Sequence, residues 1–307
     1  MFLWLLRRVL GGALVVFATM IVTAATAAVL VPDAAPRPGL GGTAEGVRRM
    51  LHGDFGVSGV VPGSVTVRTL FERGVQVDLA LLAGGLVSGT LVGLAGGLFC
   101  AARPRSPAAR GLEALATVLF CTPVYLVALS LLLLFEPTFG SLAHVHGFLE
   151  PGRFTEPQKS LWHWFQAMLV PWVLVGIPVA AAVLRLTAAQ TIENLDRDYV
   201  QTAAAAGLRR RRVIRHAARP TYTTTAAFLG TQVRPLVLNM MFVEYVFFLP
   251  GFLWYTKRAI GSDPPLWTRP DIPTLEGIAI WTAVLVVTLG LLSDAAVLLL
   301  EPRVRPS

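Results

Sequence analysis

The chain has 307 residues, of which 54% are hydrophobic and only 14% are Asp, Glu, Lys or Arg. A soluble domain carries about 25% charged residues, so this composition excludes an ordinary soluble globule. The formal net charge of +8 does not indicate nucleic-acid binding, because such proteins concentrate charge on a soluble face, whereas apolar runs of about 20 residues, long enough to cross a bilayer, separate the charges here.

The apolar runs predict an all-α, polytopic membrane protein with six transmembrane helices, forming a single domain over residues 1–307. Arginines gather at the N-terminus, in the second and fourth connections and at the C-terminus. Because positively charged loops stay in the cytoplasm, both termini are expected on the cytoplasmic side. The spans are expected at about 9–31, 75–102, 112–135, 166–186, 221–249 and 275–300.

The first span, in the stretch LLRRVLGGALVVFATMIVTAATAA, also has features of a signal peptide. A charged start precedes an apolar run, and small residues follow near Ala27. The apolar run is too long for a signal peptide, however, and five further spans follow. We therefore expect an uncleaved first helix, and a mature N-terminus near residue 29 would contradict this.

Four glycines in the second span, Gly85, Gly89, Gly93 and Gly97, are each four residues apart. This spacing puts them on one helix face, where two backbones can approach closely. We expect a helix-packing seam there, either within the chain or against a partner.

Three histidines in the third connection, His144, His146 and His163, raise the question of a metal site. Their spacing fits no closed ligand set, and the tryptophans beside His163 are typical of a membrane interface. Cys100 and Cys121 lie in or beside apolar spans and form no metal-type cluster. We therefore expect no metal site and interpret both cysteines as packing residues.

Charged side chains within the predicted spans are the candidates for a polar pathway. Arg234 and Glu244 fall in the fifth span and Asp294 in the sixth. Such residues are costly in lipid and usually face a partner or a wet cavity. Ten residues separate Arg234 from Glu244, about 15 Å along a helix, so these two are not expected to pair. A purely structural role is the alternative for all three.

The segment from 193 to 219 reads ENLDRDYVQTAAAAGLRRRRVIRHAAR. Acidic residues come first and basic residues last, which suits the dipole of a helix. The alanine run favours a helix, and Gly207 can end it in a left-handed cap. A smooth helix of this kind can dock in a groove of another protein. Topogenic charge or binding of anionic lipid remain alternatives for the arginines.

This segment resembles the cytoplasmic signature loop of ABC importer permeases, and in particular the first membrane subunit of the dipeptide/oligopeptide family. The resemblance lies in the pattern D-Y-V-x-T-A-x-x-x-G-L, which begins at Asp198. Further similar stretches follow one another in order along nearly the whole chain. They are LLRRVL near the N-terminus, HGDFGVS (52–58), CTPVYLVAL (121–129), VEYVFFLPG (243–251), DIPTLEG (271–277) and EPRVR (301–305).

The resemblance implies a multi-pass, non-catalytic transport subunit in the bacterial cytoplasmic membrane. It implies a second, homologous permease subunit, two ABC ATPase subunits that bind ATP and Mg²⁺, and an extracytoplasmic substrate-binding protein. This chain itself would bind no cofactor, which fits its lack of a Walker-type phosphate loop. The coupling residues carried over are Asp198, Tyr199, Thr202, Ala203, Gly207, Leu208, Arg209, Arg210 and His216.

The sequence also departs from the family pattern. Alanines stand where an early charged residue and a basic residue before the glycine are usual, and Arg209 to Arg212 follow the glycine instead. The first outside connection is short, so the cargo, a peptide or a similar small solute, is not specified. The alternative function is a self-contained secondary carrier or channel, although no inverted repeat is visible. A membrane enzyme or scaffold is a third class, for which no paired catalytic residues are evident.

Overall fold

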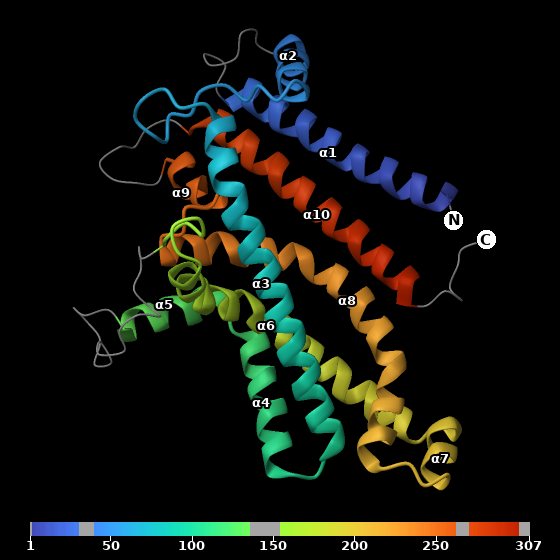
Figure 1. Cartoon of the computed structure of the whole chain (residues 1–307). Helices are drawn as coiled ribbons and strands as arrows, with labels where there is room; N and C mark the ends of the chain where they lie inside the picture. The colour runs from blue at the N-terminus through green and yellow to red at the C-terminus, as the bar shows by residue number, and fades with distance from the viewer. Residues whose placement is uncertain (1, 31–39, 136–153, 262–269, 301–307) are drawn as a thin grey trace. The chain divides into compact units, whose positions relative to one another are not determined.

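The computed structural model describes residues 2–30, 40–135, 154–261 and 270–300, and this part of the chain is almost entirely helical (Figure 1). The all-α fold class expected from the apolar runs is confirmed. The helices are α1 (Phe2–Leu30), α2 (Leu40–Leu51), α3 (Val67–Ala102), α4 (Pro107–Cys121), α5 (Val124–Phe135), α6 (Leu161–Leu195), α7 (Asp198–Ala205), α8 (Arg210–Phe247), the 3-10 turn η1 (Leu253–Tyr255), α9 (Thr256–Ala259) and α10 (Ile272–Leu300).

Four helices of the described part are long and apolar enough to cross a membrane, and the number is six if each of two bent pairs counts as one span. The four are α1, α3, α6 and α10, which correspond to the first, second, fourth and sixth expected spans. The bent pairs are α4 with α5, and the two parts of α8. The multi-pass prediction is confirmed, but the third and fifth spans are not single straight helices.

Prolines account for both breaks. Thr122, which precedes Pro123, has an extended backbone with φ −87° and ψ 125°, because proline disfavours the helical conformation in the residue before it. As a result α4 ends at Cys121, and α5 leaves it at an angle of 101°. In α8 the second part begins at Pro235, and the two parts are bent by 59°.

The backbone divides into two compact units. Unit 1 comprises Met1–Leu79, Pro250–Leu292 and Arg305–Ser307, and unit 2 comprises Ala80–Leu249 and Ser293–Val304. α3 and α10 therefore contribute residues to both units. The single domain expected over residues 1–307 stays a prediction.

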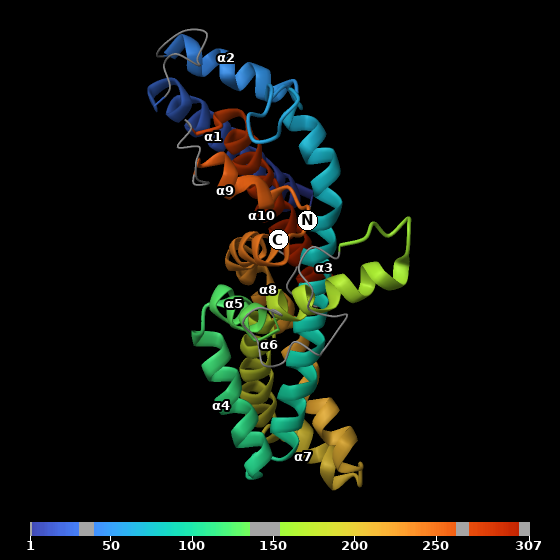
Figure 2. The ribbon, with the colours of Figure 1, turned by 90° about the vertical axis from the view of Figure 1, so that its left-hand side faces the viewer.

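Unit 2 is built around α6, which packs against α4, α5 and α8. Figures 1 and 2 show α4 running beside α3 and α6. Small side chains fill much of the contact between these helices, since alanines and Cys100 make up most of one buried cluster there. Small residues let helix backbones approach closely, which favours helix association in a membrane.

Unit 1 contains a short helix, α2, that is not one of the six expected spans. α2 is a 12-residue helix in the connection between the first two expected spans, and it packs against α1. The ideal Cβ position of Gly46 on α2 lies 3.1 Å from Cβ of Ala24 on α1. Met50 on α2 is buried in the same cluster as Ala24 and Ile280 of α10. The polar side of α2 carries Arg48 and Arg49 in its last turn.

Candidate functional site

The short helix α7 has the conformation that the alanine run and glycine predict. After α7, Gly207 adopts φ +82°. The Leu208 N–H donates to the Ala203 carbonyl (3.4 Å), and the Gly207 N–H donates to the Ala204 carbonyl (3.0 Å). This pair of bonds is a Schellman cap, which satisfies the last carbonyls of the helix and requires a left-handed residue.

α7 packs on the first turns of α8, beside the end of α6 (Figure 1). Val200 of α7 is buried with Val213 and Ala217 of α8, and Leu195 of α6 packs against them. The Asn194 side chain donates from Nδ2 to the Ala217 carbonyl at 3.0 Å. α7 is therefore held as one rigid piece with the ends of α6 and α8.

Two of the predicted coupling residues meet within this piece. The rings of Tyr199 and His216 lie edge to face, with centroids 5.4 Å apart. His216 is half-buried, whereas 42% of the Tyr199 surface is exposed. The contact with the half-buried His216 therefore helps to hold the Tyr199 ring in place. The geometry leaves Tyr199 on the surface that a partner can reach.

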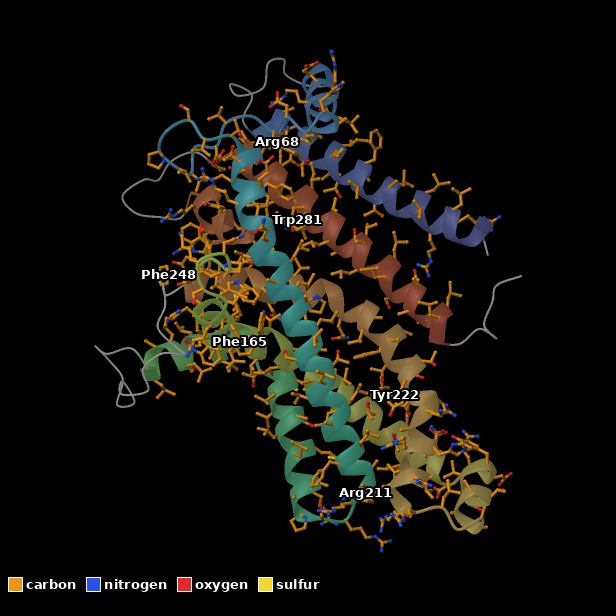
Figure 3. All side chains as sticks on the ribbon, in the orientation of Figure 1. Arg68, Phe165, Arg211, Tyr222, Phe248 and Trp281 are labelled. Atoms are coloured by element: carbon orange, nitrogen blue, oxygen red, sulfur yellow. The ribbon has the colours of Figure 1, made fainter. Side chains whose placement is uncertain are left out.

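The outer surface of this piece combines small or apolar residues with positive charge. Tyr199, Thr202 and Leu208 are exposed on it, and Ala203 is half-buried. The exposed arginines 209–212 lie at the turn into α8, where Figure 3 labels Arg211. Asp198 lies exposed in the first turn of α7, where it complements the positive end of the helix dipole. Such a surface can dock in a groove whose rim carries acidic groups.

One arginine of the cluster has a partner within unit 2. Arg210 donates from Nη2 to the Ala102 carbonyl, the last residue of α3, at 3.0 Å. This bond links the start of α8 to the end of α3. The α7–α8 turn is thus connected to α3, α6 and α8 at once.

The four glycines of the second expected span face α6 within the same chain. An ideal Cβ on Gly85 lies 2.6 Å from Val175 Cγ1, and one on Gly89 lies 2.6 Å from the Gly176 carbonyl oxygen. A Cβ on Gly93 or Gly97 lies 2.7 Å from the carbonyl oxygen of Ala180 or Leu184, respectively. The structure thus places the seam inside unit 2, between α3 and α6.

The three candidate pathway residues lie on α8 and α10. Glu244 is completely buried in α8, and Asp294 is half-buried in α10. Arg234 lies on α8, but its side chain is outside the described part. The predicted separation of Arg234 and Glu244 by about 15 Å holds for a straight helix only, and α8 bends at Pro235 between them.

The histidines of the third connection show no metal geometry where they are described. His144 and His146 lie outside the described residues. His163 bonds through Nδ1 to Ser160 Oγ at 2.8 Å, at the N-terminus of α6. In the described residues, no group of three His, Cys, Asp or Glu side chains has the arrangement of a metal site.

The sequence analysis missed two carboxylates in unit 1. Asp78 lies in the second expected span and is completely buried. Asp271 directly precedes α10, and its Oδ2 accepts bonds from Ser58 Oγ (3.0 Å), Gly59 N (2.9 Å) and Thr274 Oγ1 (2.7 Å). An acidic residue in an apolar run was the available signal for Asp78.

Comparison with known proteins adds an independent observation. Residues 93–306 match the family described as binding-protein-dependent transport system inner membrane component. The chain is 30% identical over 278 residues to the oligopeptide transport system permease protein OppB of Mycobacterium tuberculosis, an alignment that covers 88% of this chain and 82% of OppB. It is 26% identical over 274 residues to the dipeptide transport system permease protein DppB of Escherichia coli, covering 83% of this chain and 78% of DppB.

Proposed function

Because the chain belongs to the family of binding-protein-dependent transport system inner membrane components, we propose that it forms half of the translocation pathway of an ATP-driven importer. The family and the relatives support a multi-pass permease subunit in the bacterial inner membrane. Relatives are named for oligopeptide and dipeptide transport. Peptides or similar small solutes are therefore the proposed cargo of this chain.

The observation that carries the proposal is the α7–α8 turn. A short helix with a left-handed glycine cap holds Tyr199 and Leu208 on the outside, while Val200 fixes the helix to α6 and α8. We propose that an ATPase subunit grips residues 198–216 and moves them as one piece. The non-catalytic character proposed for this chain follows from that division of labour, with ATP and Mg²⁺ bound in the ATPase subunits.

The proposed complex contains a second, homologous permease subunit, two ATPase subunits and an extracytoplasmic substrate-binding protein. ATP shifts the permease between conformations only if it binds one arrangement of the ATPases more tightly. A rigid α7 transmits that bias, because its cap and its packing oppose bending within the segment. The start of α8 then moves together with α7 and with the end of α6.

Cross-linking in the assembled complex tests this proposal. In a chain with Cys100 and Cys121 replaced by alanine, we place a cysteine at Thr202 on α7 and, as a matched control, at Arg105 in the exposed α3–α4 connection. A short cross-linker is expected to capture an ATPase subunit from position 202 and not from position 105. Capture of lipid alone from position 202 in the working complex would contradict the proposal.

A second test addresses the cap. Gly207→Trp places a large side chain at φ +82°, a conformation that L residues other than glycine adopt at a cost of about 1–2 kcal/mol. We expect ATP hydrolysis without transport, or a complex that fails to assemble. Full transport by this variant counts heavily against the coupling role. Transport by the purified chain alone, without ATPase subunits, favours the self-contained carrier instead.

A further inference from the structure

The carboxylate of Asp78 joins three segments of unit 1 that lie far apart in the sequence. Its Oδ1 accepts a bond from the Phe252 backbone N–H at 2.7 Å. Its Oδ2 accepts a bond from Trp281 Nε1 on α10, also at 2.7 Å. Figure 3 shows Trp281 beside α3, the helix that carries Asp78. Both oxygens are therefore used, each by a donor from a different segment.

An ionisable side chain in this position is expensive unless it is bonded. Asp78 has no exposed surface, and burial of a carboxylate costs several kcal/mol before any partner compensates for it. Bonds to a charged acceptor are roughly twice as strong as bonds between neutral groups. The two hydrogen bonds offset the cost of burying Asp78, and they hold their donors in defined positions. An apolar residue at this site cannot do so.

The segment fastened by Asp78 is the 250–255 loop that follows α8. α8 ends at Phe247, and Phe248 has a left-handed backbone with φ +52°. Phe252 and Leu253 are buried in unit 1 at 1% and 2% exposure. The loop is therefore the point where the chain leaves α8 and becomes fixed in unit 1.

The 250–255 loop is also packed tightly against α3 near Asp78. Gly74, one turn before Asp78, abuts the backbone of Gly251 and Phe252 so closely that a Cβ would collide with it. The Phe71 ring packs edge-on against Phe252 and Trp281, with centroids 5.5 and 5.0 Å away. The loop is thus held by sterics on one side and by hydrogen bonds on the other.

We propose that Asp78 is a positioning residue that fixes the 250–255 loop, which follows α8 in the chain, to α3 and α10 within unit 1. This inference rests on the proposed function, in which ATPase subunits move the start of α8. The bonds to Phe252 and Trp281 pass that displacement to α3 and α10. Without these bonds the 250–255 loop can move independently of α3 and α10, and a displacement of α8 no longer displaces unit 1.

Spin labels at two positions in the complex with its ATPase subunits follow this transmission without a known substrate. One label is placed at Arg215, exposed in the second turn of α8, and the other at Ile260, 57% exposed just after α9 in unit 1. In the wild-type chain, addition of ATP and Mg²⁺ is expected to change the mobility of both labels. In Asp78→Asn the Arg215 label still responds, while the response at Ile260 falls about tenfold.

Double substitution separates a positioning role from a general loss of structure. In Asp78→Asn an amide NH₂ faces the N–H of Phe252 or Trp281, so two donors oppose each other. Trp281→Phe removes one donor, and in Asp78→Asn/Trp281→Phe the remaining oxygen of Asn can still accept from Phe252. The Ile260 response of the double variant is therefore expected to be at least threefold larger than that of Asp78→Asn.

Trp254→Phe is the matched control for loss of a tryptophan. Trp254 lies in the same loop, and its Nε1 has no hydrogen-bond partner in the described part of the chain. Its substitution should leave the Ile260 response within about twofold of wild type.

The responses of the two labels distinguish failure of the proposed function from failure of the positioning role of Asp78. A wild-type complex in which neither label responds to ATP overturns the proposed function. Responses at both positions in Asp78→Asn that equal those of wild type overturn the positioning role alone. Equal loss at Arg215 and Ile260, or no recovery in the double variant, also overturns it, because either result means that the substitution acts on the fold in general.

Discussion

The two parts of α3 contact their neighbours in different ways, one by close backbone packing and the other by hydrogen bonds to a buried carboxylate. Between Gly85 and Gly97, in unit 2, the helix lies against α6 with hardly any side chain between the backbones. At Asp78, in unit 1, a buried carboxylate bonds to a loop and to α10. The first contact is close and non-directional, whereas the second is set by the positions of two donors.

The difference shows which kind of change each region tolerates. A glycine seam is sensitive to volume and indifferent to polarity, because its energy comes from close packing of backbones. A buried carboxylate is sensitive to hydrogen-bonding chemistry even when volume is conserved, because an unpaired buried donor keeps its full desolvation cost. Substitutions matched in size or in chemistry therefore distinguish the two regions.

The largest effect is expected from breaking the seam with a bulky residue. Gly93→Leu drives a side chain into the Ala180 carbonyl oxygen and Val183, and a backbone atom within a helix cannot move aside cheaply. We expect a loss of about 3 kcal/mol in the free energy of unfolding, measured as thermal stability in detergent. Gly111→Leu on α4 is the control, since no described atom lies within 4 Å of its ideal Cβ. Equal stability of the two variants would refute the seam.

Removing the carboxylate tests the other fastening. Asp78→Leu keeps a similar volume but leaves the Phe252 N–H and Trp281 Nε1–H without an acceptor. Each orphaned donor costs about 1–3 kcal/mol, offset in part by relief of the buried charge. We expect a net loss of about 2 kcal/mol and faster hydrogen exchange at residues 250–255. Unchanged exchange in that loop would show that sterics alone hold it.

A smaller effect is expected at the second carboxylate of unit 1. Asp271→Ala removes the acceptor for Ser58, Gly59 and Thr274. Gly59 is exposed, so water can replace part of what is lost, and we expect about 1 kcal/mol. Hydrogen exchange at residues 56–60 should rise while exchange at 250–255 stays constant. A rise at 250–255 would mean that the two carboxylates act as one network.

The smallest effect is expected from alanine substitutions at two positions of the glycine seam, Gly85 and Gly93. Gly85→Ala meets Val175 Cγ1, the end of a side chain, whereas a Cβ on Gly93 also meets a backbone oxygen. Turning the Val175 side chain about 30° from its rotamer costs about 1 kcal/mol, so Gly85→Ala should cost about that much and Gly93→Ala clearly more. Equal unfolding midpoints of these two variants would show that α3 and α6 shift apart as rigid bodies.

The same contrast explains how much the sequence reveals. Four glycines in strict register predict a packing seam, because the periodicity is local and visible in one helix. The partners of Asp78 lie 174 and 203 residues away along the chain, so no local pattern identifies them. An acidic residue in an apolar run is visible in the sequence, but its two donors are not.

Local sequence signals predict some breaks between helices better than others. Gly207 was identified as a helix cap from its place after the alanine run, and its backbone has the left-handed conformation. Pro123 is an equally local signal for a break, and the single span predicted at 112–135 contains a bend of 101°. α2 is short and amphipathic, so its sequence lacks the run of about 20 apolar residues that marks a membrane span.

The backbone conformation of Gly207 determines which residues can replace it in the α7–α8 turn. No described atom lies within 4 Å of its ideal Cβ position, so handedness of the backbone, and not lack of room, selects the residue there. A D-alanine introduced by semisynthesis has the mirror-image preference and should stiffen the turn without touching a neighbour. The shape of the α7–α8 turn therefore depends on the backbone chirality of a single position.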